Sequence, residues 1–288
     1  MTRIPSSPAP AGPCAVPAPA GPRAVPAPAD PLVGGAALDA LPVLAGFSFP
    51  VAVVASELDA DGCARTLIEA GEVDEIFPFA SVTKPIVAWS ALIAVERGLL
   101  DLEAPAEAGT AHGSAGAGTA VLPGATVRHL LAHASGIAFD SDAVLAAPGT
   151  RRIYSNRGIE LLGERLEEAT ATPLETWVET TVLEPLGMSS VLVPGSPAHS
   201  GEGSARDLAV FARELAAPRL VGADLAAEAT SVAFPGLDGV LPGYGRQAPN
   251  DFGLGVEVRG RKHPHWTGTA NSPATFGHFG QSGSFIWV

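Results

Sequence analysis

The sequence predicts an α/β fold of the α+β kind, with a mostly antiparallel sheet formed from both ends of the chain and flanked by helices. Strand-like segments precede residue 80, a long helical middle follows, and short strand-like segments return after about residue 250. Strands at both ends of one chain that share a sheet leave the middle as a helical insertion domain.

Residues 1–31 differ in composition from the rest of the chain. A nine-residue motif of Pro, Ala and Gly begins at Pro8, Pro17 and Pro26. It has little to bury and few backbone N–H groups to pair, which favours a disordered, polyproline-like tail. The folded domain is expected at residues 32–288. Its sheet part is expected at about 32–80 and 250–288, and its helical part at about 81–249, with apolar residues sufficient for a sizeable core.

A hairpin and a buried helix are predicted around residue 81. Residues 47–57 and 65–69 read as strands joined by a turn at Asp59-Ala-Asp-Gly62. The stretch from Pro85 to Glu96 is apolar nearly all round, which predicts a helix buried on most faces, and Gly98 ends it.

The remaining elements are predicted by capping residues and short apolar runs. Helices are expected over Thr126–Gly136 and Asn156–Ala169, and from Thr172-Pro-Leu-Glu175 and Ser204-Ala-Arg-Asp207 onward. Short strands are expected at Phe252–Val258, Ala274–Gly280 and Ser284–Val288.

Ser81 and Lys84 form the first candidate for chemistry. Lys84 is one of only two lysines in the chain, and it follows Ser81 by three residues where the helix begins. Residues i and i+3 share a helix face, so the ammonium can reach the hydroxyl, and a helix N-terminus favours developing negative charge. A serine nucleophile needs both. A chance Ser-x-x-Lys on an ordinary helix is the alternative.

Two further motifs follow along the chain. Tyr154, one of two tyrosines, stands two residues before Asn156 at a predicted loop–helix junction. His278-Phe-Gly280 lies on a predicted strand, where alternation places His278 and Gly280 on one face. Taken alone, Tyr154 is better explained as a packing residue, and a hydrogen-bonded strand histidine is the alternative for His278.

In this order, Ser81-Val-Thr-Lys84, Tyr154-Ser-Asn156 and His278-Phe-Gly280 resemble the three motifs of the serine β-lactamase and penicillin-binding-protein superfamily. Two more segments, Leu130–Ile137 and Ser204–Leu208, are similar to segments of its class C β-lactamase-like branch, which includes esterases and D-aminopeptidases. The resemblance covers about residues 35–288 and implies a β-lactamase/transpeptidase-like fold.

The resemblance also implies catalytic roles. Ser81 would attack a carbonyl and form an acyl-enzyme, while Lys84 and Tyr154 would take and return its proton. Both groups have ordinary pKa values near 10, so the pair must be tuned by its surroundings. The backbone N–H groups of Ser81 and Gln281 would form the oxyanion hole.

Substrate binding is implied for four positions: Asn156, His278, Gly280 and Gln281. Asn156 would contact a substrate amide or water and orient Lys84. His278 would line the pocket near the leaving group or a substrate carboxylate. No metal or organic cofactor is implied. His129 and His133, at i and i+4, are half of a possible metal site, but a structural helix–loop role is favoured because no further ligand cluster accompanies them.

Two departures from the family pattern matter. In the family the third motif is often Lys-Thr-Gly, whereas this chain has His278-Phe-Gly280. A neutral imidazole is a poorer partner for a substrate carboxylate than an ammonium. This favours an esterase or amidase over a true β-lactamase. The chain also stops at Val288, where the family continues with a strand and a helix. We therefore expect a C-terminally truncated domain with an open sheet edge and an uncovered apolar face.

Composition narrows the partners. The net charge of −13 argues against nucleic acid and anionic membrane surfaces. No long apolar stretch and no secretory signal is recognised, so a cytoplasmic location is expected. The sequence thus predicts a serine hydrolase that cleaves a small ester, amide or lactam. The alternatives are a catalytically silent binding or assembly protein of the same fold and a D,D-peptidase. The oligomeric state is left open.

Overall fold

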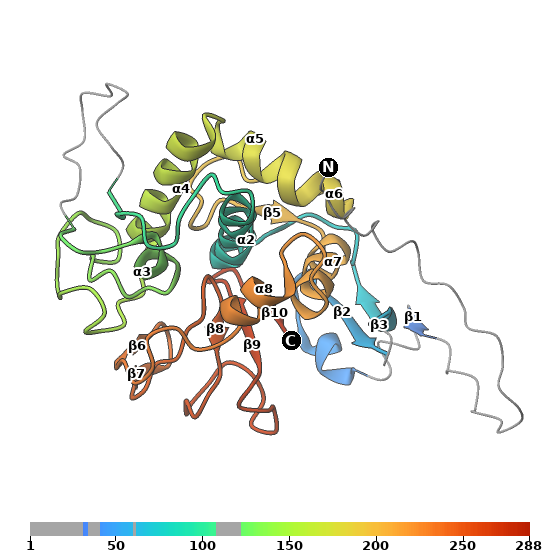
Figure 1. The fold of residues 1–288 in the computed structure, drawn as a ribbon. Helices are drawn as coiled ribbons and strands as arrows, with labels where there is room; N and C mark the ends of the chain where they lie inside the picture. Colours follow the sequence, from blue (N-terminus) through green and yellow to red (C-terminus); the bar gives the residue numbers. More distant parts are fainter. Residues whose placement is uncertain (1–30, 34–40, 60–61, 108–121) are drawn as a thin grey trace, which may run out of the picture.

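The computed structural model describes residues 31–33, 41–59, 62–107 and 122–288. Helix α2 (Thr83–Glu96) runs through the middle of the molecule, and the other helices and the sheets are arranged around it (Figure 1). The tail predicted for residues 1–31 lies, apart from Pro31, outside the described residues, so the domain boundary stays a prediction.

The helices fall mostly between the two groups of strands, as the sequence predicts. A short 3₁₀ turn, η2, leads into α2, and α5, a π-helical turn (η3) and α6 follow one another without a break. The bounds are η1 (Pro42–Gly46), η2 (Ala80–Val82), α3 (Val127–Leu131), α4 (Asn156–Thr170), α5 (Leu174–Val178), η3 (Glu179–Leu183), α6 (Glu184–Leu186), α7 (Ala205–Ala216) and α8 (Ala223–Ala229).

The predicted mixed fold of helices and mostly antiparallel strands from both ends of the chain is confirmed, but the strands form two separate three-stranded sheets rather than the one sheet expected. One has the order β1-β3-β2, in which β2 and β3 form the predicted antiparallel hairpin, and the other has the antiparallel order β10-β9-β8. Their bounds are β1 (Leu32–Val33), β2 (Ala52–Leu58), β3 (Ala64–Gly71), β8 (Glu257–Val258), β9 (Phe276–Phe279) and β10 (Phe285–Trp287). Two small pairs, β4 (Phe77–Pro78) with β5 (Glu202–Gly203) and β6 (Gly239–Leu241) with β7 (Gly245–Gln247), complete the described strands.

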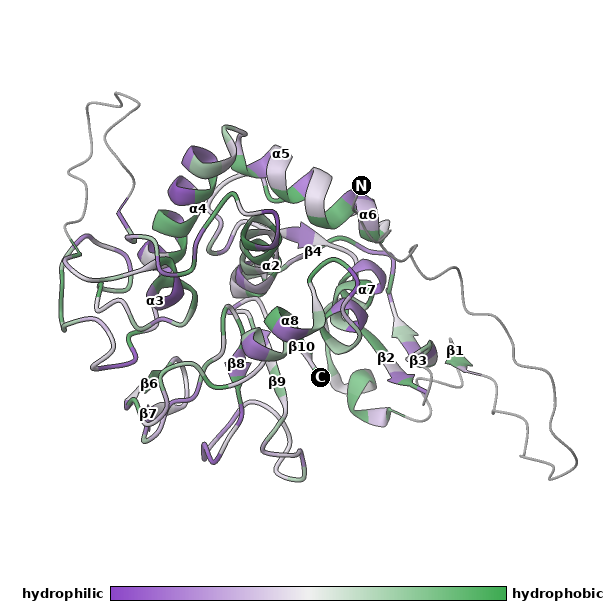
Figure 2. Ribbon diagram, viewed as in Figure 1, coloured by the Kyte–Doolittle hydropathy of each residue, from purple (hydrophilic) through white to green (hydrophobic). Residues whose placement is uncertain are grey.

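Helix α2 forms the centre of the main hydrophobic core because nearly all of its residues are apolar. Ile86 and Leu92 have no exposed surface, and the fully buried Trp89 donates its indole N–H to the buried carboxylate of Glu214 at 3.1 Å. By contrast, α4 carries both hydrophilic and hydrophobic residues (Figure 2), as a helix with one solvated face should. The site residues at the start of α2 are therefore attached to a helix that is buried in the core.

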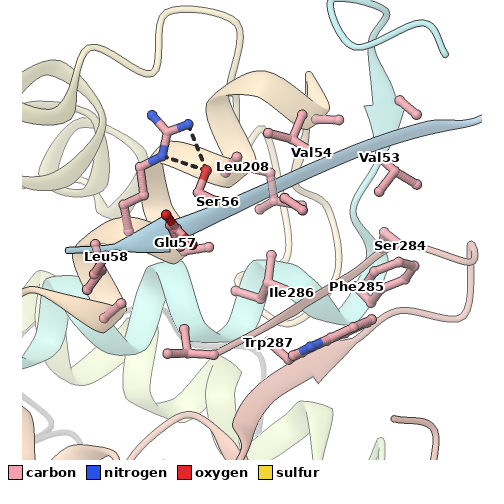
Figure 3. A pocket seen from close by; sticks show the side chains of 18 of the residues that line it. Val53, Val54, Ser56, Glu57, Leu58, Leu208, Ser284, Phe285, Ile286 and Trp287 are labelled. Atoms are coloured by element: carbon pink, nitrogen blue, oxygen red, sulfur yellow. Dashed lines mark hydrogen bonds between the residues drawn. The ribbon is translucent and has the colours of Figure 1, made fainter. Parts of the chain in front are cut away.

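An apolar groove of about 510 Å³ lies between the two sheets. It is lined by β2, by one face of α7 and by β10, with Val54, Leu208 and Ile286 among its residues (Figure 3). β2 and β10 are both edge strands of their sheets, and Trp287 is 43% exposed. Each of these strands therefore has one edge without a hydrogen-bonded neighbour among the described strands, and the predicted truncation stays a prediction.

Three local predictions differ from the structure. The first strand begins at Ala52 rather than Phe47, because Pro50 lacks the N–H that a ladder requires. The first turn of α5 is not capped by Thr172; instead the Glu167 carboxylate accepts the Leu174 N–H at 2.9 Å. Helix α3 ends at Leu131, short of the expected Gly136, because His133 takes a left-handed backbone with φ +53°.

Among the described residues, no helix combines the length and apolarity needed to cross a bilayer. The cytoplasmic location stays a prediction.

The core role of α2 can be tested at Leu92. We expect Leu92→Ala to lower the free energy of unfolding by about 2–5 kcal/mol, because it opens a cavity in a fully buried site. Leu99→Ala, at a leucine that is 45% exposed just beyond the helix, should change it by less than about 1 kcal/mol. Urea denaturation measures both, and equal losses would contradict this description of the core.

Candidate active site

The backbone just before Ser81 is strained and braced. Ala80 has φ +46°, a left-handed conformation that costs a non-glycine residue about 1–2 kcal/mol. Its carbonyl accepts the Thr83 hydroxyl at 2.6 Å, and the same Thr83 oxygen accepts the Gly201 N–H at 2.8 Å. These bonds hold Ser81 in the turn that opens α2, at the positive end of the helix.

The Lys84 side chain is completely buried and surrounded by oxygen atoms. Its Nζ lies 3.0 Å from Ser81 Oγ, 2.7 Å from Asn156 Oδ1 and 2.8 Å from the Ala198 carbonyl oxygen. The last two oxygens can only accept hydrogen bonds, whereas the Ser81 hydroxyl can also donate one. An ammonium donates to all three oxygens, whereas the neutral amine can keep its two N–H groups on Asn156 and Ala198 and turn its lone pair to the Ser81 hydroxyl.

Burial lowers the pKa of Lys84 from 10.5 to about 7, and the carboxylate of Glu160 opposes this shift only in part. At neutral pH a substantial share of the amine is therefore unprotonated. A group whose pKa lies near the working pH is suited to accept and return a proton.

Tyr154 stands at the start of α4, where Ser155 caps the helix by accepting the Gly158 N–H at 2.8 Å. Its ring lies against the Lys84 amine, with Nζ 4.8 Å from the ring centroid. Burial raises the pKa of Tyr154 far above its ordinary value, although a hydrogen bond with Ser81 acts in the opposite direction. The phenol therefore stays protonated at neutral pH and serves as a hydrogen-bond donor.

His278 faces the phenol from β9. Its Nε2 lies 3.5 Å from the Tyr154 hydroxyl, and its Nδ1 lies 2.8 Å from the Phe279 carbonyl oxygen. A carbonyl only accepts, so the proton sits on Nδ1 and the Nε2 lone pair points toward the phenol. Burial, with a smaller effect from Lys84, lowers the pKa of His278 to about 4, so the imidazole is neutral. Only 2% of the His278 surface is exposed, and its role near the leaving group or a substrate carboxylate stays a prediction.

The turn after β9 lies directly against the Ser81 segment. A Cβ added at Gly280 would come within 2.3 Å of the Phe79 carbonyl oxygen, so only glycine permits this approach. Ser284 Oγ donates to that same carbonyl at 2.6 Å. Gln281, which follows Gly280, is exposed beside the site.

All seven predicted site residues belong to one region of the structure. Lys84 contacts Ser81, Tyr154 and Asn156, and the His278–Gln281 segment meets Tyr154 and the chain before Ser81.

Sequence reasoning missed two contributors to this region, the Ala198 carbonyl and the buried Arg152. A backbone carbonyl leaves no signal in a sequence, and Arg152 was distinguishable only by its place beside Tyr154. His129 and His133 use their Nδ1 atoms separately, 2.9 Å from the Thr126 hydroxyl and 3.3 Å from the Ser155 N. Among the described residues, no three His, Cys, Asp or Glu side chains are grouped to hold a metal ion.

A serine at a helix start, with a buried amine and a tyrosine beside it, is typical of a serine hydrolase of the serine–lysine kind. A family model described as Beta-lactamase matches residues 69–288. The chain therefore belongs to the beta-lactamase family.

Individual relatives agree with this. A solved beta-lactamase from Mycobacterium bovis is 47% identical with a TM-score of 0.77, and 86% of each chain is covered. A Streptomyces D-stereospecific amidohydrolase shares the fold at 22% identity, with a TM-score of 0.57 and coverage of 87% of this chain and 85% of the other.

Two curated relatives match over shorter stretches. Esterase EstB of Burkholderia gladioli is 33% identical over 148 residues, which are 40% of this chain and 38% of the esterase. A putative D-alanyl-D-alanine carboxypeptidase of Salmonella paratyphi B is 29% identical over 186 residues, 49% of this chain and 43% of that protein. The chain thus matches less than half the length of either.

The lowered pKa of Lys84 makes stability depend on pH. Between pH 10.5 and about 7 the unfolded chain holds the lysine proton and the folded chain does not, so the wild type loses stability as the pH falls through this window. Lys84→Met lacks this effect. We expect the difference in unfolding free energy, variant minus wild type, to grow by up to about 1.4 kcal/mol per pH unit from pH 9.5 down to 7 and to level off below. Urea denaturation across this range measures it, and parallel curves would contradict the shift.

Proposed function

We propose that the protein is a serine hydrolase that forms an acyl-enzyme on Ser81 and cleaves a small ester or amide. One observation carries the proposal: the buried Lys84 amine lies 3.0 Å from Ser81 Oγ, with two acceptor-only oxygens taking its N–H groups. That arrangement leaves the amine lone pair for the serine proton. Membership of the beta-lactamase family supports it.

Acylation would begin with the Ser81 hydroxyl and a substrate carbonyl. As Oγ bonds to the carbonyl carbon, its proton passes to Lys84 Nζ, and the carbonyl oxygen becomes an oxyanion. The N–H groups of Ser81 and Gln281 would stabilise that charge; the close approach at Gly280 and the positive end of α2 support this assignment.

Breakdown of the tetrahedral intermediate expels the leaving group, which takes a proton from the Tyr154 phenol while Lys84 returns its proton to Tyr154. Water then attacks the acyl carbon and gives a proton to Lys84, and Lys84 passes that proton to Ser81 Oγ as the bond between Oγ and the acyl carbon breaks and the acid product leaves. The raised pKa of Tyr154 supports the role of proton donor, and the pKa of about 7 for Lys84 supports the role of base.

The third motif favours substrates without a carboxylate beside the scissile bond. His278 is buried and neutral, so it supplies no cation where the family often places a lysine. An ester or neutral amide is therefore a better match than a β-lactam or a peptide with a free carboxylate. The match to an esterase supports this preference, and the match to a putative carboxypeptidase keeps amide cleavage as the second candidate.

Labelling with a serine-directed fluorophosphonate tests the nucleophile. Intact mass should show one adduct on the wild type and on Ser231→Ala, a control at an exposed serine whose hydroxyl bonds to the Ala227 carbonyl, and none on Ser81→Ala. Hydrolysis of p-nitrophenyl acetate by Ser81→Ala should fall by at least about 10³-fold, since covalent catalysis is lost. No adduct on folded wild type would favour a silent binding protein, and an adduct on Ser81→Ala would refute the assignment.

Substrate charge is tested by two p-nitrophenyl esters that differ only in a carboxylate on the acyl group. The wild type should favour the neutral ester, because His278 is uncharged. His278→Lys should shift the ratio of kcat/KM values toward the carboxylate ester by about tenfold, since a hydrogen bond to a charged group contributes about 1.5–3 kcal/mol. An unchanged ratio in a folded variant would show that this position does not set charge preference.

A further inference from the structure

His133 is a buried histidine to which the proposed mechanism gives no task. It follows α3, is 2% exposed, and has φ +53°, a left-handed backbone that non-glycine residues rarely adopt. A conformation of this kind persists only when surrounding contacts enforce it. Those contacts converge on the segment that carries Tyr154.

Two hydrogen bonds join His133 to the residues on either side of Tyr154. The His133 carbonyl accepts the Ile153 N–H at 2.9 Å, and its ring Nδ1 accepts the Ser155 N–H at 3.3 Å. Because the backbone of His133 is left-handed, its carbonyl and its ring both face the segment of residues 153–155. The residues on either side of Tyr154 are thereby held by the backbone and the side chain of one residue.

The His133 ring also packs on the tyrosine ring. Their centroids are 4.6 Å apart, and the buried Phe252 meets the His133 ring edge-on at 5.4 Å. Burial, Lys84, His278 and Arg152 together lower the pKa of His133 well below its ordinary value. The ring is therefore neutral, as its Nδ1 must be in order to accept a hydrogen bond.

Arg152 makes a second connection between the segment that carries Tyr154 and the loop that carries His133. Its guanidinium is buried and donates to backbone carbonyls, including those of Ala132 and Asn250. Ala132 directly precedes His133, so two consecutive residues of this loop are tied to Arg152, Ile153 and Ser155.

We infer that His133 is a positioning residue for Tyr154, holding its backbone and ring so that the phenol faces Ser81 and His278. The inference rests on the proposed function of Tyr154 as proton donor. If His133 only fills the core, substitutions should affect stability according to side-chain size and leave turnover unchanged. If His133 positions Tyr154, turnover should depend on whether the side chain keeps a hydrogen-bond acceptor in place of Nδ1.

Three variants separate these roles in p-nitrophenyl acetate hydrolysis. His133→Leu removes the acceptor, His133→Asn keeps an acceptor oxygen and tolerates left-handed backbone, and His129→Leu is the matched control. His129 lies four residues earlier, stacks on Phe234 at 4.4 Å and serves the Thr126 cap, away from Tyr154. Thermal melts establish that each variant folds.

We expect His133→Leu to lower kcat by about 10²-fold with KM within about twofold, as displacement of a reacting group does. His133→Asn should regain about tenfold or more of that loss, and His129→Leu should keep wild-type kcat. Wild-type kcat in His133→Leu, or no recovery in His133→Asn, would overturn the inference. Because Ser81→Ala tests the nucleophile separately, that outcome would leave the proposed function intact.

A measurement on the wild type covers the case in which His133→Leu fails to fold. Nitrogen NMR of ¹⁵N-histidine protein, assigned with His133→Asn, should show the His133 proton on Nε2 and an acceptor Nδ1. A proton on Nδ1 would overturn the inference.

Discussion

Burial of the Lys84 amine is the constraint on which the rest of the site depends. Burying an ammonium away from water costs free energy. Here the Lys84 Nζ lies beside three neutral oxygens and, among the described residues, makes no ion pair with a carboxylate. Two of these oxygens belong to Asn156 and Ala198, which lie 72 and 114 positions after Lys84 in the chain. Helix α4 and the loop before β5 must therefore pack correctly on α2 to complete the surroundings of the amine, and under the proposed function this packing sets the reactivity of Ser81.

The phenol and the imidazole follow from the same burial. Tyr154 is held protonated and His278 neutral because both lie in the desolvated space around Lys84. Of the three groups, only the amine has a pKa near neutrality. In the proposed mechanism this divides the roles: Lys84 is the base, Tyr154 the donor, and His278 a neutral acceptor beside the donor. His133 and Arg152 matter because this division requires the phenol to stay within reach of Ser81.

Much of this arrangement was predictable from sequence. The scarcity of lysine and tyrosine made Lys84 and Tyr154 conspicuous, the apolar run after Pro85 predicted α2, and Ser204 predicted the cap of α7, which the Asp207 N–H confirms. The rest depends on tertiary contacts. The Ala198 carbonyl has no side-chain signal, the left-handed backbone of His133 ended α3 early, and the groove between β2 and β10 arises from how two sheets meet.

The most direct test of the account is the pKa of the Lys84 amine itself. With only two lysines in the chain, ¹³Cε-lysine protein should give two resonances, and Lys84→Met assigns the one from Lys84. NMR titration should show that resonance changing with a midpoint near pH 7, the value that burial imposes. A midpoint at or above 10.5 would mean that the amine stays protonated at neutral pH, and Lys84 would then not be the base that activates Ser81.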